Sequence, residues 1–96
     1  MTSTEPHTCS AVLEIRNRLG LHARAATLFV KTASAFRAKI DVGKDGRWVD
    51  GKGIFGLMTL EAPQGSRIEV RAAGDDAAEA LDALSALRER RFDEDG

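Results

Sequence analysis

The chain has 96 residues, of which 43% are apolar, and its 14 Lys and Arg residues are balanced by 15 Asp and Glu residues. This length predicts one domain with a core of modest size, and the balanced charge argues against a nucleic-acid-binding surface. The sequence lacks the ~18 consecutive apolar residues of a membrane span, and residues 1–6 lack the basic start and apolar run of a secretory signal. We therefore expect a cytoplasmic protein.

Residues 1–9 are predicted to form a flexible N-terminal tail, because Thr, Ser, Glu and Pro dominate their first part. The tail contains His7 and Cys9, but the chain has only one further His and no further Cys to complete a zinc site. We expect no metal site and no cofactor. A single Cys cannot form an internal disulfide, which agrees with a reducing compartment.

The first predicted strand covers residues 11–15, where Leu13 and Ile15 share one face. After a loop, a helix is predicted over residues 23–35, because no Gly or Pro interrupts this part of the chain. Apolar residues recur there at helical spacing. They are Ala26, Phe29, Val30 and Ala33.

His22 stands at or just before the first turn of this helix. Free backbone N–H groups at a helix start favour negative charge, so a phosphate on the imidazole would meet those amides and the guanidinium of Arg24. Histidine is also a common nucleophile. From the residues alone, however, a lone His at a helix start is more commonly a mediocre cap without a chemical role.

Two strands are predicted next, over residues 38–42 and 47–51, joined by a tight turn at Asp45 and Gly46. Trp48 could stack on a ligand, but it more commonly covers a solvated sheet face beside its cross-strand neighbours. We prefer the second interpretation.

A short apolar helix is predicted over residues 54–60, with Leu57 and Leu60 facing the core and Phe55 pointing outward. An exposed apolar side chain on a short helix is a liability unless a partner docks there. A purely structural role for these residues stays open, because pattern alone cannot assign seven residues to faces.

Residues 67–72 alternate apolar and charged side chains, which predicts an antiparallel strand with one solvated face. The last helix follows Gly74, where Asp76 and Glu79 have the spacing of a capping box. Its predicted buried stripe comprises Ala77, Ala80, Leu81, Leu84 and Leu87.

The predicted order of elements is β-α-β-β-α-β-α. Amphipathic strands and helices in this order predict an α+β domain, with helices on one face of a four-stranded antiparallel sheet. The pattern does not determine the order of the strands in the sheet.

The segment Gly20-Leu21-His22-Ala23-Arg24-Ala25-Ala26 resembles the active-site motif of HPr, the histidine phosphocarrier of bacterial phosphotransferase systems. The resemblance continues through residues 52–60 and 64–70 and implies an HPr-like domain over residues 10–91, with three helices on one face of an open-faced β-sandwich. It leaves residues 92–96 as an acidic C-terminal tail. Residues 91–95 resemble the tail of nitrogen-branch members of the family.

This resemblance implies that His22 accepts phosphate on Nδ1 from phosphorylated enzyme I and passes it to a histidine of an enzyme IIA. Arg24 matches the arginine that accompanies the phosphate. The chain would then be a monomeric carrier that is transiently phosphorylated, and not an enzyme acting alone. The residues that match the family's docking patch are Ala23, Thr27, Ile54, Phe55, Gly56 and Thr59.

Three positions depart from the family pattern. Ala25 replaces the usual Pro, which keeps the helix but loses some rigidity in its first turn. Gly53 stands where many members carry the regulatory serine that HPr kinase phosphorylates, so this switch should be absent. Gly56 replaces a residue that is often Lys, and contacts with partners should differ in detail.

Two other functions stay open at this point. A regulatory HPr-like module could dock on partner proteins with little or no phosphotransfer, and an unrelated α+β domain could carry an adventitious anion site. The residues do not distinguish a branch for sugar transport from one for nitrogen regulation.

Overall fold

The computed structural model describes residues 8–94. Within this range the elements follow the order expected from the sequence. They are β1 (Thr8–Glu14), α1 (Ala23–Ala33), β2 (Lys39–Lys44), β3 (Arg47–Asp50), α2 (Ile54–Thr59), β4 (Arg67–Ala73) and α3 (Ala77–Glu89), followed by a turn of 3-10 helix (Arg91–Asp93).

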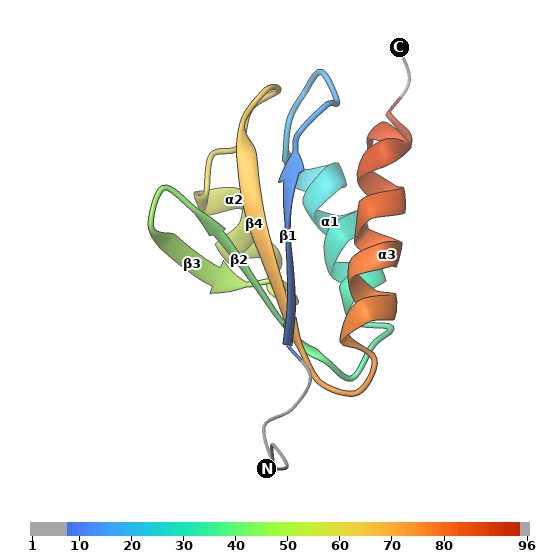
Figure 1. Cartoon of the computed structure of the whole chain (residues 1–96). Helices are drawn as coiled ribbons and strands as arrows, with labels where there is room; N and C mark the ends of the chain where they lie inside the picture. Colours follow the sequence, from blue (N-terminus) through green and yellow to red (C-terminus); the bar gives the residue numbers. More distant parts are fainter. Residues whose placement is uncertain (1–7, 95–96) are drawn as a thin grey trace.

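The four strands form one antiparallel sheet in the order β1-β4-β2-β3. The helices lie together behind the sheet: α3 packs on β1 and β4, α2 packs on β3, and α1 contacts both other helices (Figure 1). The opposite face of the sheet is open. The predicted α+β class and the open-faced sandwich are therefore confirmed.

The core lies between the sheet and the helices, and periodicity predicted most of it. Ile68, Val70 and Ala72 of β4 are buried, as are all five residues of the predicted stripe on α3. On α1, Ala26, Phe29 and Ala33 are buried as expected, Val30 is half-buried, and Ala25 is buried as well.

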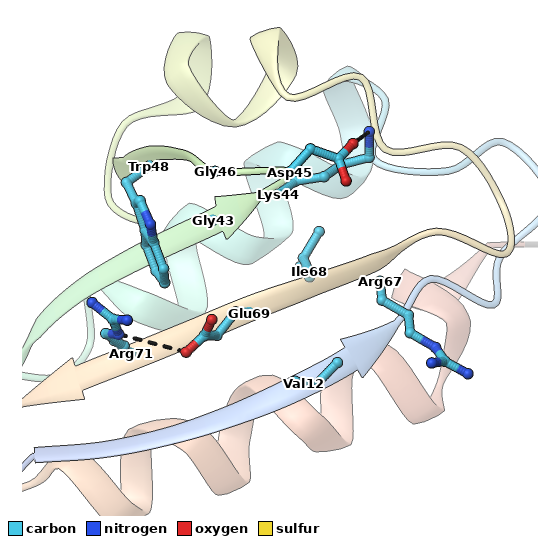
Figure 2. A pocket seen from close by; sticks show the side chains of 10 residues that line it. All are labelled: Val12, Gly43, Lys44, Asp45, Gly46, Trp48, Arg67, Ile68, Glu69 and Arg71. Atoms are coloured by element: carbon cyan, nitrogen blue, oxygen red, sulfur yellow. Dashed lines mark hydrogen bonds and ion pairs between the residues drawn. The ribbon is translucent and has the colours of Figure 1, made fainter.

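The β2–β3 hairpin has the two-residue turn predicted from the sequence. Asp45 and Gly46 have φ values of 52° and 83°, as a type I′ turn requires. Figure 2 shows Trp48 on the open face of the sheet, where the Arg71 guanidinium lies 4.2 Å from the centre of the indole ring. The ring also covers Gly43, whose Cβ, if present, would lie 2.7 Å from it. Trp48 thus covers the sheet, as we predicted.

The capping box predicted at the start of α3 is absent. Asp76 is the N-cap residue, but its side chain makes no capping hydrogen bond and Glu79 is exposed. The carboxylate instead accepts hydrogen bonds from the backbone N–H groups of Arg37 and Ala38, both at 2.8 Å. These two amides lie before β2 and occupy the acceptor oxygens that a capping box would need.

The predicted tails also differ from the structure. Strand β1 begins at Thr8, and Thr8 and Cys9 pair with β4 instead of belonging to a tail. His7, the other residue weighed for a metal site, lies outside the described residues. At the other end, Phe92 is 3% exposed, so residues 92–94 pack on the domain because an apolar side chain anchors them.

No helix within residues 8–94 has both the length and the apolar character needed to cross a membrane.

Candidate functional site

The loop between β1 and α1 is held in place by the segment that follows α2. Gly20 has a φ of +69°, and a Cβ at this position would lie 2.5 Å from the carbonyl oxygen of Ala62. The next residue, Leu21, donates its N–H to that same oxygen at 2.8 Å. Only glycine fits this close approach and conformation, and the contact fixes where α1 begins.

His22 is the N-cap residue of α1, as the sequence predicted. Its backbone is extended, its carbonyl oxygen accepts the N–H of Ala26 at 2.8 Å, and its side chain makes no capping hydrogen bond. The first turn contains no acidic residue. The positive end of the helix dipole is therefore not neutralised within the helix itself, while the His22 side chain is 31% exposed.

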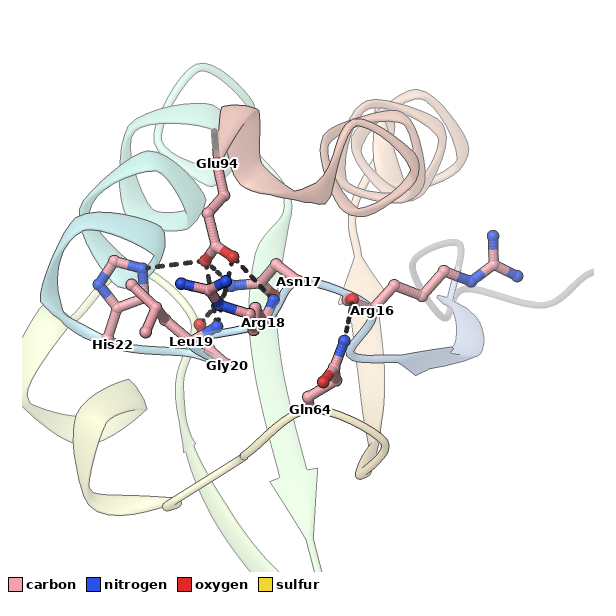
Figure 3. A network of polar contacts seen from close by, with 8 residues as sticks. All are labelled: Arg16, Asn17, Arg18, Leu19, Gly20, His22, Gln64 and Glu94. Atoms are coloured by element: carbon pink, nitrogen blue, oxygen red, sulfur yellow. Dashed lines mark hydrogen bonds and ion pairs between the residues drawn. The ribbon is translucent and has the colours of Figure 1, made fainter. Parts of the chain in front are cut away.

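Glu94 lies beside His22. Its position in the sequence did not predict this contact. Oε2 of Glu94 is 3.7 Å from Nε2 of His22 (Figure 3). The same carboxylate accepts the backbone N–H of Arg18 at 2.8 Å and that of Leu19 at 3.2 Å. The C-terminal segment thus closes over the loop that carries the histidine.

Asn17 joins the same network from inside the loop. Its side chain is fully buried, and Nδ2 donates to the carbonyl oxygen of Gly20 at 2.7 Å and to Oε2 of Glu94 at 3.0 Å. This N–H lowers the pKa of the Glu94 carboxyl below its ordinary value, and the amides of Leu19 and Arg18 act in the same direction. Glu94 is consequently held as an anion.

Sequence reasoning missed both Asn17 and Glu94. Asn17 stands among polar loop residues, where asparagine is common for reasons of turn formation alone. Glu94 lies in a run that we interpreted as a tail. The one available signal was Phe92, an apolar residue inside that acidic run, which is what anchors it to the core.

Arg24 is exposed in the first turn of α1. Within residues 8–94 its guanidinium makes no hydrogen bond or ion pair, so its donors are free for an anion. Ala23 and Thr27 are exposed on the same helix, and the hydroxyl of Thr27 donates to the carbonyl oxygen of Ala23 at 2.8 Å. The role of Arg24 in holding phosphate stays a prediction.

The other residues of the predicted docking patch lie on α2, which packs against α1. Phe55 is 82% exposed, so the prediction that it points outward is confirmed. Ile54 is half-buried and Thr59 is exposed. Gly56 lies against Val49, to which an added Cβ would come within 3.1 Å. The patch therefore extends over two adjacent helices, and its use in docking stays a prediction.

A pocket of about 320 Å³ lies beside His22. None of the residues that line this pocket belongs to α2. Its lining comprises Leu19, Leu21, His22, Glu61, Ala62 and Pro63.

Gly53 is the N-cap residue of α2, with a φ of −120°. A Cβ there would lie 3.6 Å from the nearest atom, the carbonyl oxygen of Asp50, which is an ordinary contact. A serine would fit this position, but the native chain offers no hydroxyl at it.

Taken together, the site has a partly exposed imidazole at a helix start without a side-chain capping bond, a guanidinium two residues on that is free within residues 8–94, and an anchored carboxylate 3.7 Å from Nε2. Helix amides and a guanidinium stabilise an added dianion, and the carboxylate stabilises positive charge on the ring. The arrangement suits a histidine that carries an anionic group reversibly.

Comparisons with known proteins agree with this chemistry. Residues 9–90 match the family described as PTS HPr component phosphorylation site. The phosphocarrier protein HPr of Xylella fastidiosa (strain Temecula1) is 47% identical over 83 residues, which cover 86% of this chain and 93% of that protein. The HPr of Neisseria meningitidis strain Z2491 is 48% identical over 82 residues, covering 85% and 92%.

Among solved structures, HPr from Thermoanaerobacter tengcongensis superposes with a TM-score of 0.87 at 45% identity, covering 92% of this chain and 99% of that one. A further relative, the HPr-like protein Crh of Halalkalibacterium halodurans, is 42% identical over 78 residues, covering 81% of this chain and 93% of that protein.

Proposed function

The chain belongs to the HPr family of phosphocarrier proteins of the phosphotransferase system, and on that premise we propose that it carries a phosphoryl group on His22. It accepts this group from a phosphorylated enzyme I and passes it to a histidine of an enzyme IIA. The observation that carries the proposal is the position of His22, which is the N-cap residue of α1 and whose partly exposed ring makes no capping hydrogen bond.

This position suits a carrier for two reasons. An imidazole is in general a good nucleophile at neutral pH, because its neutral form is well populated. The amides at the start of α1 and the guanidinium of Arg24, which is unpaired within residues 8–94, would stabilise the phosphoryl group moderately. Moderate stabilisation matters because the group must leave again.

The exposed residues on α1 and α2 would form the surface on which both partners dock. Phe55 supports this assignment, because its apolar side chain is 82% exposed and is therefore available for contact with a partner. Ala23, Thr27, Ile54, Gly56 and Thr59 complete the surface. We place the protein in the cytoplasm, as a monomer, and both statements are predictions from the sequence.

The proposal is tested with labelled phosphoenolpyruvate, enzyme I from the same organism and this protein. We expect incorporation of phosphate that mass spectrometry maps to His22, followed by loss of the label when an enzyme IIA is added. Testing one enzyme IIA of the sugar branch and one of the nitrogen branch assigns the branch. Absence of label, or label on another residue, would contradict the proposal.

A second candidate is a regulatory module that acts by docking alone. The likeness to the HPr-like protein Crh supports it, and the exposed Phe55 agrees with both candidates. Two results together would support this candidate over the carrier. The protein would bind a partner equally tightly before and after incubation with enzyme I, and His22 would carry no label.

A further inference from the structure

We propose that Glu94 is a positioning residue that keeps the proton of His22 on Nε2 and thereby presents the lone pair of Nδ1 to the incoming phosphoryl group. The inference rests on the proposed function of His22. It assigns a role to the C-terminal segment, which the sequence had suggested to be only an acidic tail.

The tautomer of His22 depends on which atoms face each other. A neutral imidazole has one N–H and one lone pair, and a carboxylate can only accept hydrogen bonds. Oε2 of Glu94 lies 3.7 Å from Nε2 of His22, which is too long for a hydrogen bond but close enough for the carboxylate charge to act on the partial charges of the neutral ring. A lone pair on Nε2 would be repelled there, whereas an N–H is attracted. The nearby charge therefore favours the Nε2–H tautomer.

The carboxylate of Glu94 is held in place by several hydrogen bonds and cannot easily move away. Its oxygens accept hydrogen bonds from the amides of Arg18 and Leu19 and from Nδ2 of the buried Asn17. The Glu94 side chain is only 12% exposed. These donors also keep the pKa of its carboxyl low, so that it is charged at neutral pH.

The backbone after α3 turns so that Glu94 lies beside His22. Arg91, Phe92 and Asp93 all have positive φ values, between 52° and 55°, which turn the chain back after α3. The buried ring of Phe92 anchors the turn, and the amide of Glu94 donates to the carbonyl oxygen of Arg91 at 3.0 Å. Three consecutive non-glycine residues in this conformation are costly, and the anchored carboxylate is what the turn delivers.

The lone pair of Nδ1 attacks phosphorus, a nitrogen–phosphorus bond forms, and the bond between phosphorus and the donor's leaving atom breaks with its electron pair remaining on that atom. His22 keeps its proton on Nε2, so the ring gains one positive charge. Glu94 faces that charge and stabilises it. When the phosphoryl group leaves for an acceptor, the electron pair of the bond returns to Nδ1.

The test is a two-dimensional ¹H–¹⁵N spectrum of the imidazole in the unphosphorylated full chain at alkaline pH. We expect almost only the Nε2–H tautomer in the native protein and a clear increase of the Nδ1–H form in Glu94→Gln. The matched control is Asp93→Asn, which removes the same charge from the residue immediately before Glu94. Asp93 pairs with Arg90 at 3.1 Å, so this control should keep the native tautomer.

The rate of phosphoryl transfer is the second readout. We expect Glu94→Gln to slow this rate by roughly tenfold. This is the lower end of the effects seen when the residue that orients a metal-ligating histidine is mutated. Asp93→Asn should retain the native rate. The Gln oxygen can still accept the amides of Arg18 and Leu19, and their chemical shifts report whether the loop is intact. If the loop is disturbed, comparing Glu94→Asp with Glu94→Asn isolates the charge at equal length.

An unchanged tautomer ratio in the uncharged variants would overturn the inference. The tautomer is measured without any partner, so this result is independent of the proposed function. A chain that enzyme I never labels would refute the carrier role, whereas a labelled chain with the same tautomer and rate in Glu94→Gln would refute only the role of Glu94.

Discussion

Oδ1 of Asp76 accepts the backbone N–H of Ala38 at 2.8 Å, and this contact ties the start of α3 to the chain just before β2. Oδ2 accepts the N–H of Arg37 at the same distance. The Arg37 amide, followed by that of Ala38, lowers the pKa of the Asp76 carboxyl below its usual value, and the charge of Lys52 adds to this. Folding therefore favours the ionised form of Asp76.

We expect this contact to make the stability depend on acid pH. Because the pKa of Asp76 is lower in the folded state, its contribution is fully present above the unfolded pKa of ~3.9 and is lost as the pH falls through the folded value. Asp76→Asn should remove this part of the acid dependence, measured by urea unfolding between about pH 6 and 2. Asp75→Asn removes the same charge from the adjacent exposed residue and keeps both hydrogen bonds. An identical pH profile for native protein and Asp76→Asn would contradict this account.

Phe55→Ala separates docking from folding. Since Phe55 is 82% exposed, we expect its truncation to change the free energy of unfolding by less than ~0.5 kcal/mol. Binding of enzyme I or enzyme IIA should weaken by ~1–3 kcal/mol if Phe55 is an anchor of the interface. Thermal melting and calorimetric titration measure the two quantities.

Two further variants calibrate this experiment. Val12→Ala truncates another exposed apolar residue, 63% exposed on the open face of the sheet, and should leave partner binding unchanged. Phe29→Ala truncates a phenylalanine that is 1% exposed and should cost ~3–5 kcal/mol of stability. A loss of that size in Phe55→Ala would remove Phe55 from the docking surface.

Arg24→Ala should lower the rate of phosphoryl transfer more than partner affinity. Its guanidinium makes no hydrogen bond or ion pair within residues 8–94, so the bonds we expect form only when the phosphoryl group is present. Hydrogen bonds to charged groups contribute ~1.5–3 kcal/mol, which corresponds to a roughly 10- to 100-fold slower transfer. Rapid-quench kinetics measure it, and Lys31→Ala, an exposed cation in the last turn of the same helix, is the control. Equal effects of both variants would argue against a specific role for Arg24.

Gly53→Ser tests the missing regulatory hydroxyl. The position has a negative φ and space for a Cβ, and serine is a good N-cap residue, so stability should change by only a few tenths of a kcal/mol. We expect an HPr kinase to phosphorylate the variant and not the native chain. Peptide mass spectrometry over residues 52–60 checks both. Kinase-dependent phosphate on Thr59 of the native chain would show that the short helix is regulated after all.

Residue patterns predicted the fold well wherever one face of an element is buried. The alternation from Arg67 to Ala72 and the stripe from Ala77 to Leu87 both reflect burial on one side, which periodicity records directly. The turn at Asp45 and Gly46 was equally predictable, because few residues accept its backbone conformation. The order of the strands, in contrast, depends on pairing between distant segments, and the residue pattern does not determine it.

The two polar networks were not predictable for a related reason. Asp76 had the local spacing of a capping box, but amides 39 and 38 positions earlier in the chain bind its carboxylate instead. Glu94 contacts a loop that lies more than 70 positions before it. Local patterns contain no information about partners that only the folded chain brings together. His22 itself was predictable, since its position follows from where a helix begins.

The most direct test of the central claim is phosphate incorporation by His22→Ala. The native side chain makes no capping bond, so its loss should cost at most ~1 kcal/mol of stability, and the melting curve should show a folded protein. The matched control is His7→Ala, which removes the only other histidine of the chain. With phosphoenolpyruvate and enzyme I, we predict full labelling of His7→Ala and no label on a folded His22→Ala. Equal labelling of the two variants would contradict the claim that His22 carries the phosphoryl group.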